Sequence, residues 1–306
     1  MLLKQFKSAY SKQLWDLAYK QWLHLGVGLF PGAETDTCHV IDLEALITFT
    51  LMAATEERRL FEAVLEWILE NRSMINASRL KRMATLFEEY GKPPHIHSVR
   101  TLLDWVRKDT EEQLLLHIAT LPGMEKFHKR KILSDVNIQD PWLLQLKLRA
   151  MFGVNARSEI FLFLLQHGPA NSNAMAREIG FAQKQVYLIL ENWTEAGILH
   201  RIRKGRAGNY SLQKKDHWLS LLNMTGMPET INWIQMFGLL VQIFLILKET
   251  DDTYLIASRF RDIAPKADAI LSSNLGKHLP DPSRYQGEIY FAPFADTILA
   301  ALHQLY

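Results

Sequence analysis

The segment from Met175 to Leu212, MAREIGFAQKQVYLILENWTEAGILHRIRKGRAGNYSL, changes its hydrophobic period part-way along. Its first part repeats apolar residues at intervals of three and four, which predicts helices with a break at Gly180. Its last part alternates apolar and basic residues around Gly205 and Gly208, which predicts a β-hairpin. The segment therefore predicts two short helices followed directly by a hairpin.

The residue types also indicate where these elements begin and end. Asn171 or Ser172 can cap a first helix that ends at Gly180, and Gly197 is the expected C-terminal glycine of a second helix over residues 182–196. In the second helix Val186, Leu190 and Trp193 lie on one face, because they recur at helical spacing. The opposite face is polar and is expected to be free to meet a ligand; it carries Gln183, Lys184, Tyr187 and Glu191.

A third helix is expected before this segment, over residues 157–167, where RSEIFLFLLQH is amphipathic and stops at Gly168 and Pro169. The hairpin is expected to begin at Ile198 and to return over residues 209–212, with Lys204 and Arg206 at its basic tip. Three short helices followed by a hairpin describe a winged helix-turn-helix.

Specific positions in this segment resemble the DNA-binding core of ArsR-type and MarR-type winged-helix regulators. In those families an apolar-Ala-x-x-apolar-Gly turn precedes the recognition helix, that helix ends in Leu-x-x-Ala-Gly, and the wing returns as Tyr-x-Leu. The matching residues are Met175, Ala176, Ile179, Gly180, Val186, Leu190, Ala196, Gly197, Leu199, Tyr210 and Leu212. The resemblance covers residues 156–215 and implies a winged helix that binds DNA. Two departures leave the base preference open: Trp193 replaces the usual leucine, and Gln185 and Tyr187 replace small hydroxyl residues.

The charge distribution agrees with this interpretation. Residues 156–215 contain nine Lys or Arg and four Asp or Glu, a net charge of +5, whereas the rest of the 306-residue chain has a net charge of −3. A basic module within a slightly acidic chain is typical of phosphate contact. The alternative is that the arginines of the hairpin are simply solvated.

The sequence therefore predicts a duplex-DNA interface. The helix over residues 182–196 is expected to enter the major groove, where glutamine can pair with adenine and lysine with guanine. The wing is expected to contact phosphates or the minor groove. The candidate DNA-binding residues are Ser172, Gln183, Lys184, Gln185, Tyr187, Arg201, Arg203, Lys204 and Arg206.

The remaining sequence predicts a mainly α protein with three regions. Residues 1–152 form a helical N-terminal domain for sensing, partner binding or a degenerate helix-turn-helix; residues 153–215 form the winged helix-turn-helix; residues 216–306 form a helical C-terminal region with a possible role in dimerisation. Helical periodicity occurs over residues 4–25, 43–54, 55–70, 76–90, 98–107, 110–119, 142–152, 231–249, 254–272 and 291–305.

Two helical stretches allow more than one interpretation. Residues 61–90 have the spacing of a second helix-turn-helix with positive charge from Arg79, Lys81 and Arg82, but the missing glycine turn and wing favour a plain bundle. The apolar run Met236–Leu247 (MFGLLVQIFLIL) is shorter than the ~20 residues that cross a membrane. It is therefore expected to be either an internal core helix or the contact of a homodimer that reads paired half-sites.

Other signals exclude several kinds of site. The single cysteine, Cys38, excludes a disulfide framework, and the charged N-terminus lacks the apolar core of a signal peptide, so a cytoplasmic location is expected. His95 and His97 lack further ligands at metal spacing, and no nucleotide or hydrolase motif occurs, so neither a metal nor a cofactor is expected. We expect a DNA-binding transcriptional regulator, not an enzyme. The alternatives are a protein–protein interaction component in which the winged helix is a packing module, and an enzyme with an unrecognised N-terminal active site.

Overall fold

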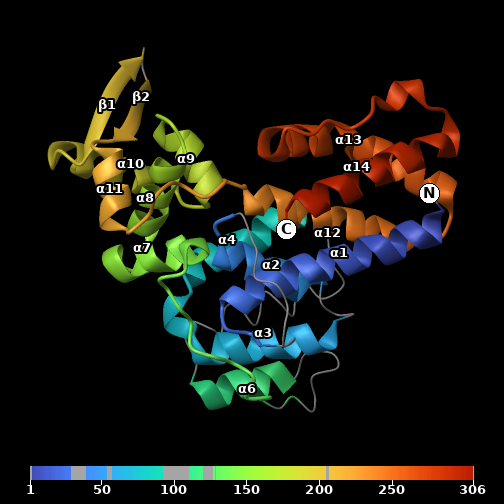
Figure 1. Ribbon diagram of the computed structural model, residues 1–306, viewed down its shortest axis with the longest axis horizontal. Helices are drawn as coiled ribbons and strands as arrows, with labels where there is room; N and C mark the ends of the chain where they lie inside the picture. Colours follow the sequence, from blue (N-terminus) through green and yellow to red (C-terminus); the bar gives the residue numbers. More distant parts are fainter. Residues whose placement is uncertain are drawn as a thin grey trace.

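The computed structural model describes residues 2–28, 39–53, 57–91, 110–119, 127, 129–204 and 207–305 (Figure 1). Within these ranges the chain is mainly helical, and one two-stranded antiparallel sheet is present. The predicted fold class, mainly α with a small β-hairpin, is confirmed at this level.

The elements follow one another along the chain in this order: α1 (Leu3–His24), α2 (Leu43–Ala53), α3 (Arg58–Glu70), α4 (Ala77–Phe87), α6 (Glu111–Ala119), α7 (Leu144–Phe152), α8 (Ala156–Gln166), α9 (Ser172–Ile179), α10 (Gln183–Glu195), β1 (Leu199–Lys204), β2 (Ala207–Leu212), α11 (Lys215–Leu221), α12 (Trp233–Glu249), α13 (Thr253–Leu275) and α14 (Phe291–Gln304). Short 3₁₀ turns occur at Arg72–Met74, Glu88–Tyr90, Pro141–Leu143, Pro282–Arg284 and Gly287–Tyr290. The helix expected over residues 98–107 lies outside the described residues, as do Cys38, His95 and His97. Helix α11 was not predicted.

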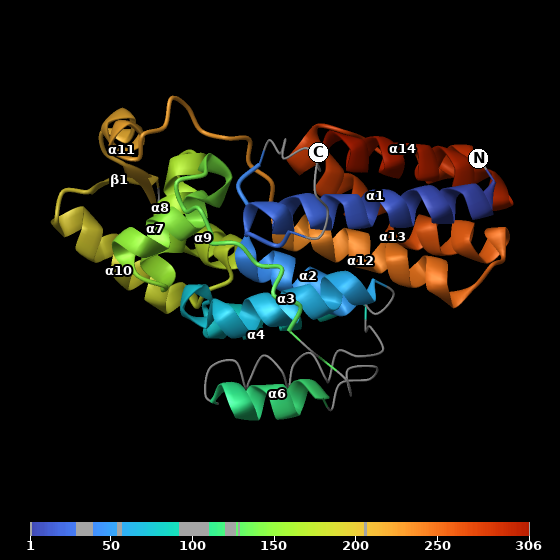
Figure 2. The same ribbon diagram turned by 60° about the horizontal axis from the view of Figure 1, so that its bottom comes forward.

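The N-terminal helices α1–α4 and the C-terminal helices α12–α14 share one hydrophobic core. Phe49 of α2 stacks on Phe237 of α12 with ring centroids 4.4 Å apart, and Phe6 of α1 meets Phe291 of α14 edge to face at 5.5 Å. The two ends of the chain, which we expected as separate regions, therefore pack together, and Figure 2 shows α1 beside α12, α13 and α14.

Helix α12 lies at the centre of this core. It packs against α2, α13, α4 and α1, and Tyr10 of α1 donates a hydrogen bond from its hydroxyl to the Leu240 carbonyl at 2.7 Å. A helix that is apolar nearly all round is buried in this way because every face needs an apolar neighbour. The run Met236–Leu247 is thus a core helix, and the proposal that it forms a dimer contact is wrong. None of the described helices has the length and apolar character needed to span a membrane.

The stretch over residues 61–90 belongs to the bundle. Helix α4 packs mainly against α2 and α12 and is separated from α3 by a 3₁₀ turn at Arg72–Met74. Arg79, expected to add positive charge to its surface, is only 2 % exposed and pairs with buried carboxylates. The plain bundle interpretation therefore holds here, and the surface charge of α4 comes from Lys81 and Arg82.

Helices α7–α11 and the hairpin gather at one end of the molecule (Figures 1 and 2). Helix α7 packs against α8 across Gly153, and Leu144 and Leu148 of α7 share a small core with Phe161 and Leu165 of α8. The boundary expected after residue 152 therefore lies inside a packed helix pair.

Candidate nucleic-acid interface

Helices α8, α9 and α10 surround a small apolar core of their own. Met175 and Ile179 of α9 pack there with Val186 and Leu190 of α10, as their helical spacing predicted. Asn171 caps α9, because its side-chain oxygen accepts a hydrogen bond from the Ala174 N–H at 2.9 Å. The caps and the inward faces thus set the angle at which α10 leaves the turn after α9.

The hairpin closes one side of this core. Strands β1 and β2 pair antiparallel in a register that runs from Leu199 opposite Leu212 to Lys204 opposite Ala207. Ala170, before α9, forms an additional bridge with Tyr210, and the Leu199 and Tyr210 side chains are buried in the core. The hairpin is therefore attached to α8–α10 through both strands.

The outward face of α10 is open to solvent. Its exposed side chains near the N-terminal half are Gln183, Lys184, Gln185, Tyr187 and Leu188. Helix α10 packs mainly against α9, α8 and β1, which leave these side chains exposed in the described part of the chain. Four of the nine predicted site residues are thus exposed on the first turns of α10: Gln183, Lys184 and Tyr187 lie on one face, and Gln185 lies about 100° round the helix from Lys184.

Ser172 differs from these four residues. It is 9 % exposed, and its hydroxyl oxygen accepts a hydrogen bond from the Gln183 side-chain amide at 3.0 Å. Ser172 therefore orients Gln183 from α9, and most of its own surface is inaccessible to a ligand.

Arg201 and Glu191 form a contact between the hairpin and α10. The Arg201 guanidinium donates to the Glu191 carboxylate at 2.9 Å and lies over the Tyr210 ring, 5.6 Å from its centroid. The Tyr210 hydroxyl donates to the other oxygen of the Glu191 carboxylate at 2.6 Å. Burial, together with this hydrogen bond to Glu191, raises the pKa of Tyr210 to about 12.

These contacts correct one expectation and qualify another. Glu191 was expected on the free face of α10, but the hairpin folds back on it and uses both of its oxygens. Arg201 forms an ion pair with Glu191, and this pair holds the hairpin against α10. Gly208 permits this approach, because a Cβ there would lie 2.6 Å from the Arg201 Nε. The backbone of Arg203 and Lys204 continues β1; their side chains, and Arg206 altogether, lie outside the described residues.

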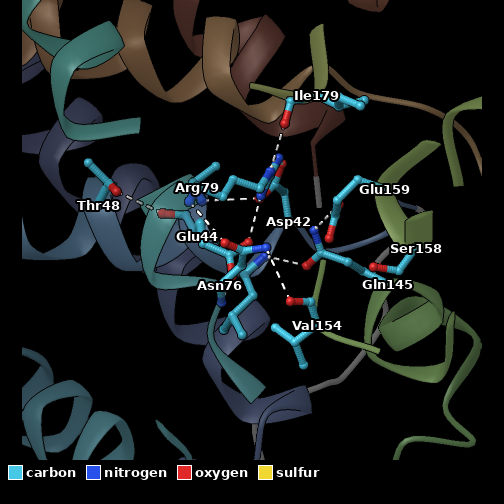
Figure 3. Close-up of polar contacts among 12 residues, drawn as sticks. Asp42, Glu44, Thr48, Asn76, Arg79, Gln145, Val154, Ser158, Glu159 and Ile179 are labelled. Carbon is cyan, nitrogen blue, oxygen red and sulfur yellow. Dashed lines mark hydrogen bonds and ion pairs between the residues drawn. The ribbon is translucent and has the colours of Figure 1, made fainter. Parts of the chain in front are cut away.

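A buried cluster of charges connects this module to the helical bundle (Figure 3). It contains three carboxylates, Asp42, Glu44 and Glu159, and two guanidiniums, Arg79 and Arg149. The side chains of all except Asp42 are at most 3 % exposed. The sequence did not reveal this cluster, although Glu44 within the apolar run LEALITFTLMA was a signal that a partner must exist.

Arg149 of α7 joins two of the carboxylates. Its guanidinium donates to both oxygens of Glu44, at 2.8 and 2.6 Å, and to Glu159 of α8 at 2.6 Å. Gln145 donates to the second oxygen of Glu159 at 2.9 Å. Burial by itself would raise the pKa of Glu44, but Arg149 and Arg79 outweigh it and hold the pKa below its usual value.

Arg79 of α4 connects this ion-pair network to the turn between α9 and α10. Its guanidinium donates to both oxygens of Asp42, at 2.6 and 2.5 Å, and to Glu44 at 2.6 Å. Its Nε donates to the carbonyl of Ile179, the last residue of α9, at 2.9 Å. Burial would raise the pKa of Asp42, but the charge and hydrogen bonds of Arg79 hold it below its usual value. The network thus fixes the α9–α10 turn on α4.

The geometry of this cluster is that of a structural ion-pair network that holds helices together. Its carboxylates are occupied by guanidinium, amide and backbone donors, and the space beside Asp42, Glu159 and His167 measures about 60 Å³. Such a space accommodates water more readily than an organic substrate. Within the described residues, no group of His, Cys, Asp and Glu has the arrangement of a metal site.

Comparisons with protein-family models, with curated proteins and with solved structures gave no match to this chain.

Proposed function

We propose that this chain is a DNA-binding transcriptional regulator in which α8, α9, α10 and the hairpin act as a winged helix-turn-helix. The observation that carries the proposal is the open face at the beginning of α10: Gln183, Lys184 and Tyr187 are exposed there, and Gln185 is exposed beside it, while α8, α9 and β1 pack elsewhere on the same helix. A helix presented in this way fits the major groove of B-DNA, which admits an α-helix with its side chains.

The chemistry of that face suits a duplex. Gln183 and Gln185 offer amides that pair with adenine edges, and Lys184 can reach guanine or a phosphate. Ser172 restricts the side chain of Gln183 by accepting its amide, so this glutamine is oriented before DNA binds. Among the side chains of the hairpin, Arg203, Lys204 and Arg206 are proposed to contact the phosphate backbone, whereas Arg201 is engaged with Glu191.

One such module has a small footprint, about 600–1,000 Å² for single DNA-binding modules. We therefore further propose that two copies of the chain bind paired half-sites. Because α12 is internal, their contact must use another surface. A monomer mass in sedimentation at micromolar protein, with and without DNA, would contradict this dimer.

The proposal is tested by measuring duplex binding by fluorescence anisotropy over a range of salt concentrations. The chain should bind a labelled 30-base-pair duplex at low salt, and Lys184→Gln should lower the salt slope of log K by about 0.9, the value for one phosphate contact. Lys12→Gln, which replaces another exposed lysine, on α1, is the matched control and should leave the slope unchanged. Gln183→Ala should change the sequences recovered from a random duplex pool.

A chain that fails to bind duplex at low salt but associates stably with another protein would refute this function. That result would favour the alternative in which the winged helix is a packing module of a larger assembly.

A further inference from the structure

A groove of about 780 Å³ runs between α4 of the helical bundle and the beginning of α10. Ser78, Lys81 and Arg82 line it from α4, Asn155 lines it from the start of α8, and Ala182 and Gln185 line it from α10. Gln185 is exposed on α10 and lines this groove, so the groove adjoins the solvent-exposed surface at the beginning of that helix.

The lining of the groove is basic. Its charged residues are Arg79, Lys81 and Arg82, and no carboxylate lines it among the described residues. Arg79 is neutralised by Asp42 and Glu44, so Lys81 and Arg82, which are both exposed, supply its charge. Arg82 makes no ion pair within the part of the chain that the structure describes.

The beginning of α10 adds to this positive potential. Ala182 precedes the helix and offers no side-chain oxygen to the N–H groups of the first turn. Those amides and the positive end of the helix dipole therefore adjoin the groove without a protein acceptor from the capping position.

The two walls of the groove are held in a fixed relation. Arg79 of α4 donates to the Ile179 carbonyl at 2.9 Å, and Asn76 donates to the Val154 carbonyl at 3.4 Å. Gly180, with φ +74°, packs so tightly on α4 that a Cβ there would lie 2.2 Å from the Met83 methyl group. The groove is thus built by the same contacts that position α10.

We propose that this groove binds backbone phosphates of the duplex whose major groove α10 enters, with Arg82 and Lys81 as the contacting residues. The inference rests on the proposed function. Phosphates flank the major groove on both sides, so a helix lying in that groove brings a backbone beside its own first turn. The helical bundle then takes part in DNA binding through α4, and the footprint of the chain is larger than that of α8–α10 and the hairpin alone.

The experiment compares three full-length proteins by anisotropy with a 30-base-pair duplex between 50 and 300 mM KCl. These are the unsubstituted chain, Lys81→Gln/Arg82→Gln, and the control Lys4→Gln/Lys12→Gln, which removes the same charge from exposed positions on α1. The groove variant should bind more weakly at low salt, and its salt slope should fall by about 1.8, twice the value for one phosphate. The control should retain the original slope. Sequences selected from a random duplex pool should be the same for all three proteins, because phosphate contacts carry no base information.

The other outcomes would contradict either the groove assignment alone or the proposed function as well. If the unsubstituted chain binds but the groove variant keeps its slope, or both variants lose the same slope, the groove assignment is wrong and the proposed function stands. If inorganic phosphate raises the melting temperature of the unsubstituted chain but not of the groove variant, while DNA binding is unchanged, the groove is a site for a small anion instead. If no duplex binds at low salt, the inference and the proposed function fail together.

Discussion

Replacing Arg79 with methionine should destabilise the fold more than any surface substitution, because it removes one partner of a buried ionic network. The Arg79 side chain is 2 % exposed and donates to Asp42, Glu44 and the Ile179 carbonyl. Its loss leaves three carboxylates with one remaining guanidinium, that of Arg149. Breaking a buried ion pair from one side costs about 3–5 kcal/mol. That is a large fraction of the ~5–15 kcal/mol that stabilises typical proteins.

The loss should depend on pH in a defined direction. The folded pKa values of Asp42 and Glu44 lie below their ordinary values of 3.8 and 4.5. Such carboxylates stabilise the fold at pH values above those ordinary values, and this stabilisation is lost as the pH falls through the folded pKa. In Arg79→Met both carboxyls stay buried without Arg79, so their pKa values are higher than in the original protein. The free energy of unfolding of the variant therefore falls less on acidification than that of the original protein. The difference in stability between the two proteins should therefore narrow as the pH falls from 7 towards 4.

The assay is urea denaturation followed by far-ultraviolet circular dichroism at pH 7, 5.5 and 4. Arg157→Met is the control, because Arg157 is exposed on α8; its free energy of unfolding should stay within about 0.5 kcal/mol of the original. A loss below about 1 kcal/mol for Arg79→Met, or a difference that stays constant across this pH range, would refute the stabilising role given to the network.

Three further substitutions test the contacts around α10. Arg201→Gln should change the salt slope of DNA binding less than Lys184→Gln does, because Arg201 is already paired with Glu191; equal changes in anisotropy titrations would contradict this. Gly180→Ala and Gly197→Ala each place a side chain at positive φ, at a cost of about 1–2 kcal/mol. Gly180→Ala should be the more destabilising in thermal melts, because its Cβ also meets Met83, whereas nothing lies within 4 Å at Gly197; similar melting temperatures would count against this packing.

The local elements could be predicted from the sequence because their signals are local. Asp42 caps α2 through the Ala45 N–H, Asn76 caps α4 through the Arg79 N–H, and Gly180 ends α9 in the left-handed conformation. In each case the signal and its consequence lie within a few residues of one another. Periodicity likewise placed Val186 and Leu190 on the inner face of α10.

The long-range contacts had no such signal. Arg149 and Glu44 are 105 residues apart in the chain, and nothing in the periodicity of α7 or α2 pairs them. Glu191 was expected to be free because the sequence does not show that the hairpin folds back over α10. The ring centroid of Trp193, at a position where leucine was expected, lies 6.2 and 6.0 Å from the ring centroids of Phe152 and Phe161, so it joins α10 to α7 and α8. That role depends on helix packing that spacing alone does not specify.

The claim that the exposed face of α10 contacts duplex DNA is tested most directly by photo-crosslinking. A benzoylphenylalanine placed at Tyr187, which is 38 % exposed on that face, is irradiated in the presence of labelled duplex at low salt. The same residue placed at Tyr254, which is 59 % exposed at the start of α13, is the control. The account predicts a covalent protein–DNA adduct from position 187 and none from position 254. Equal adducts from both positions, or none from 187 while the protein still binds the duplex, would contradict it.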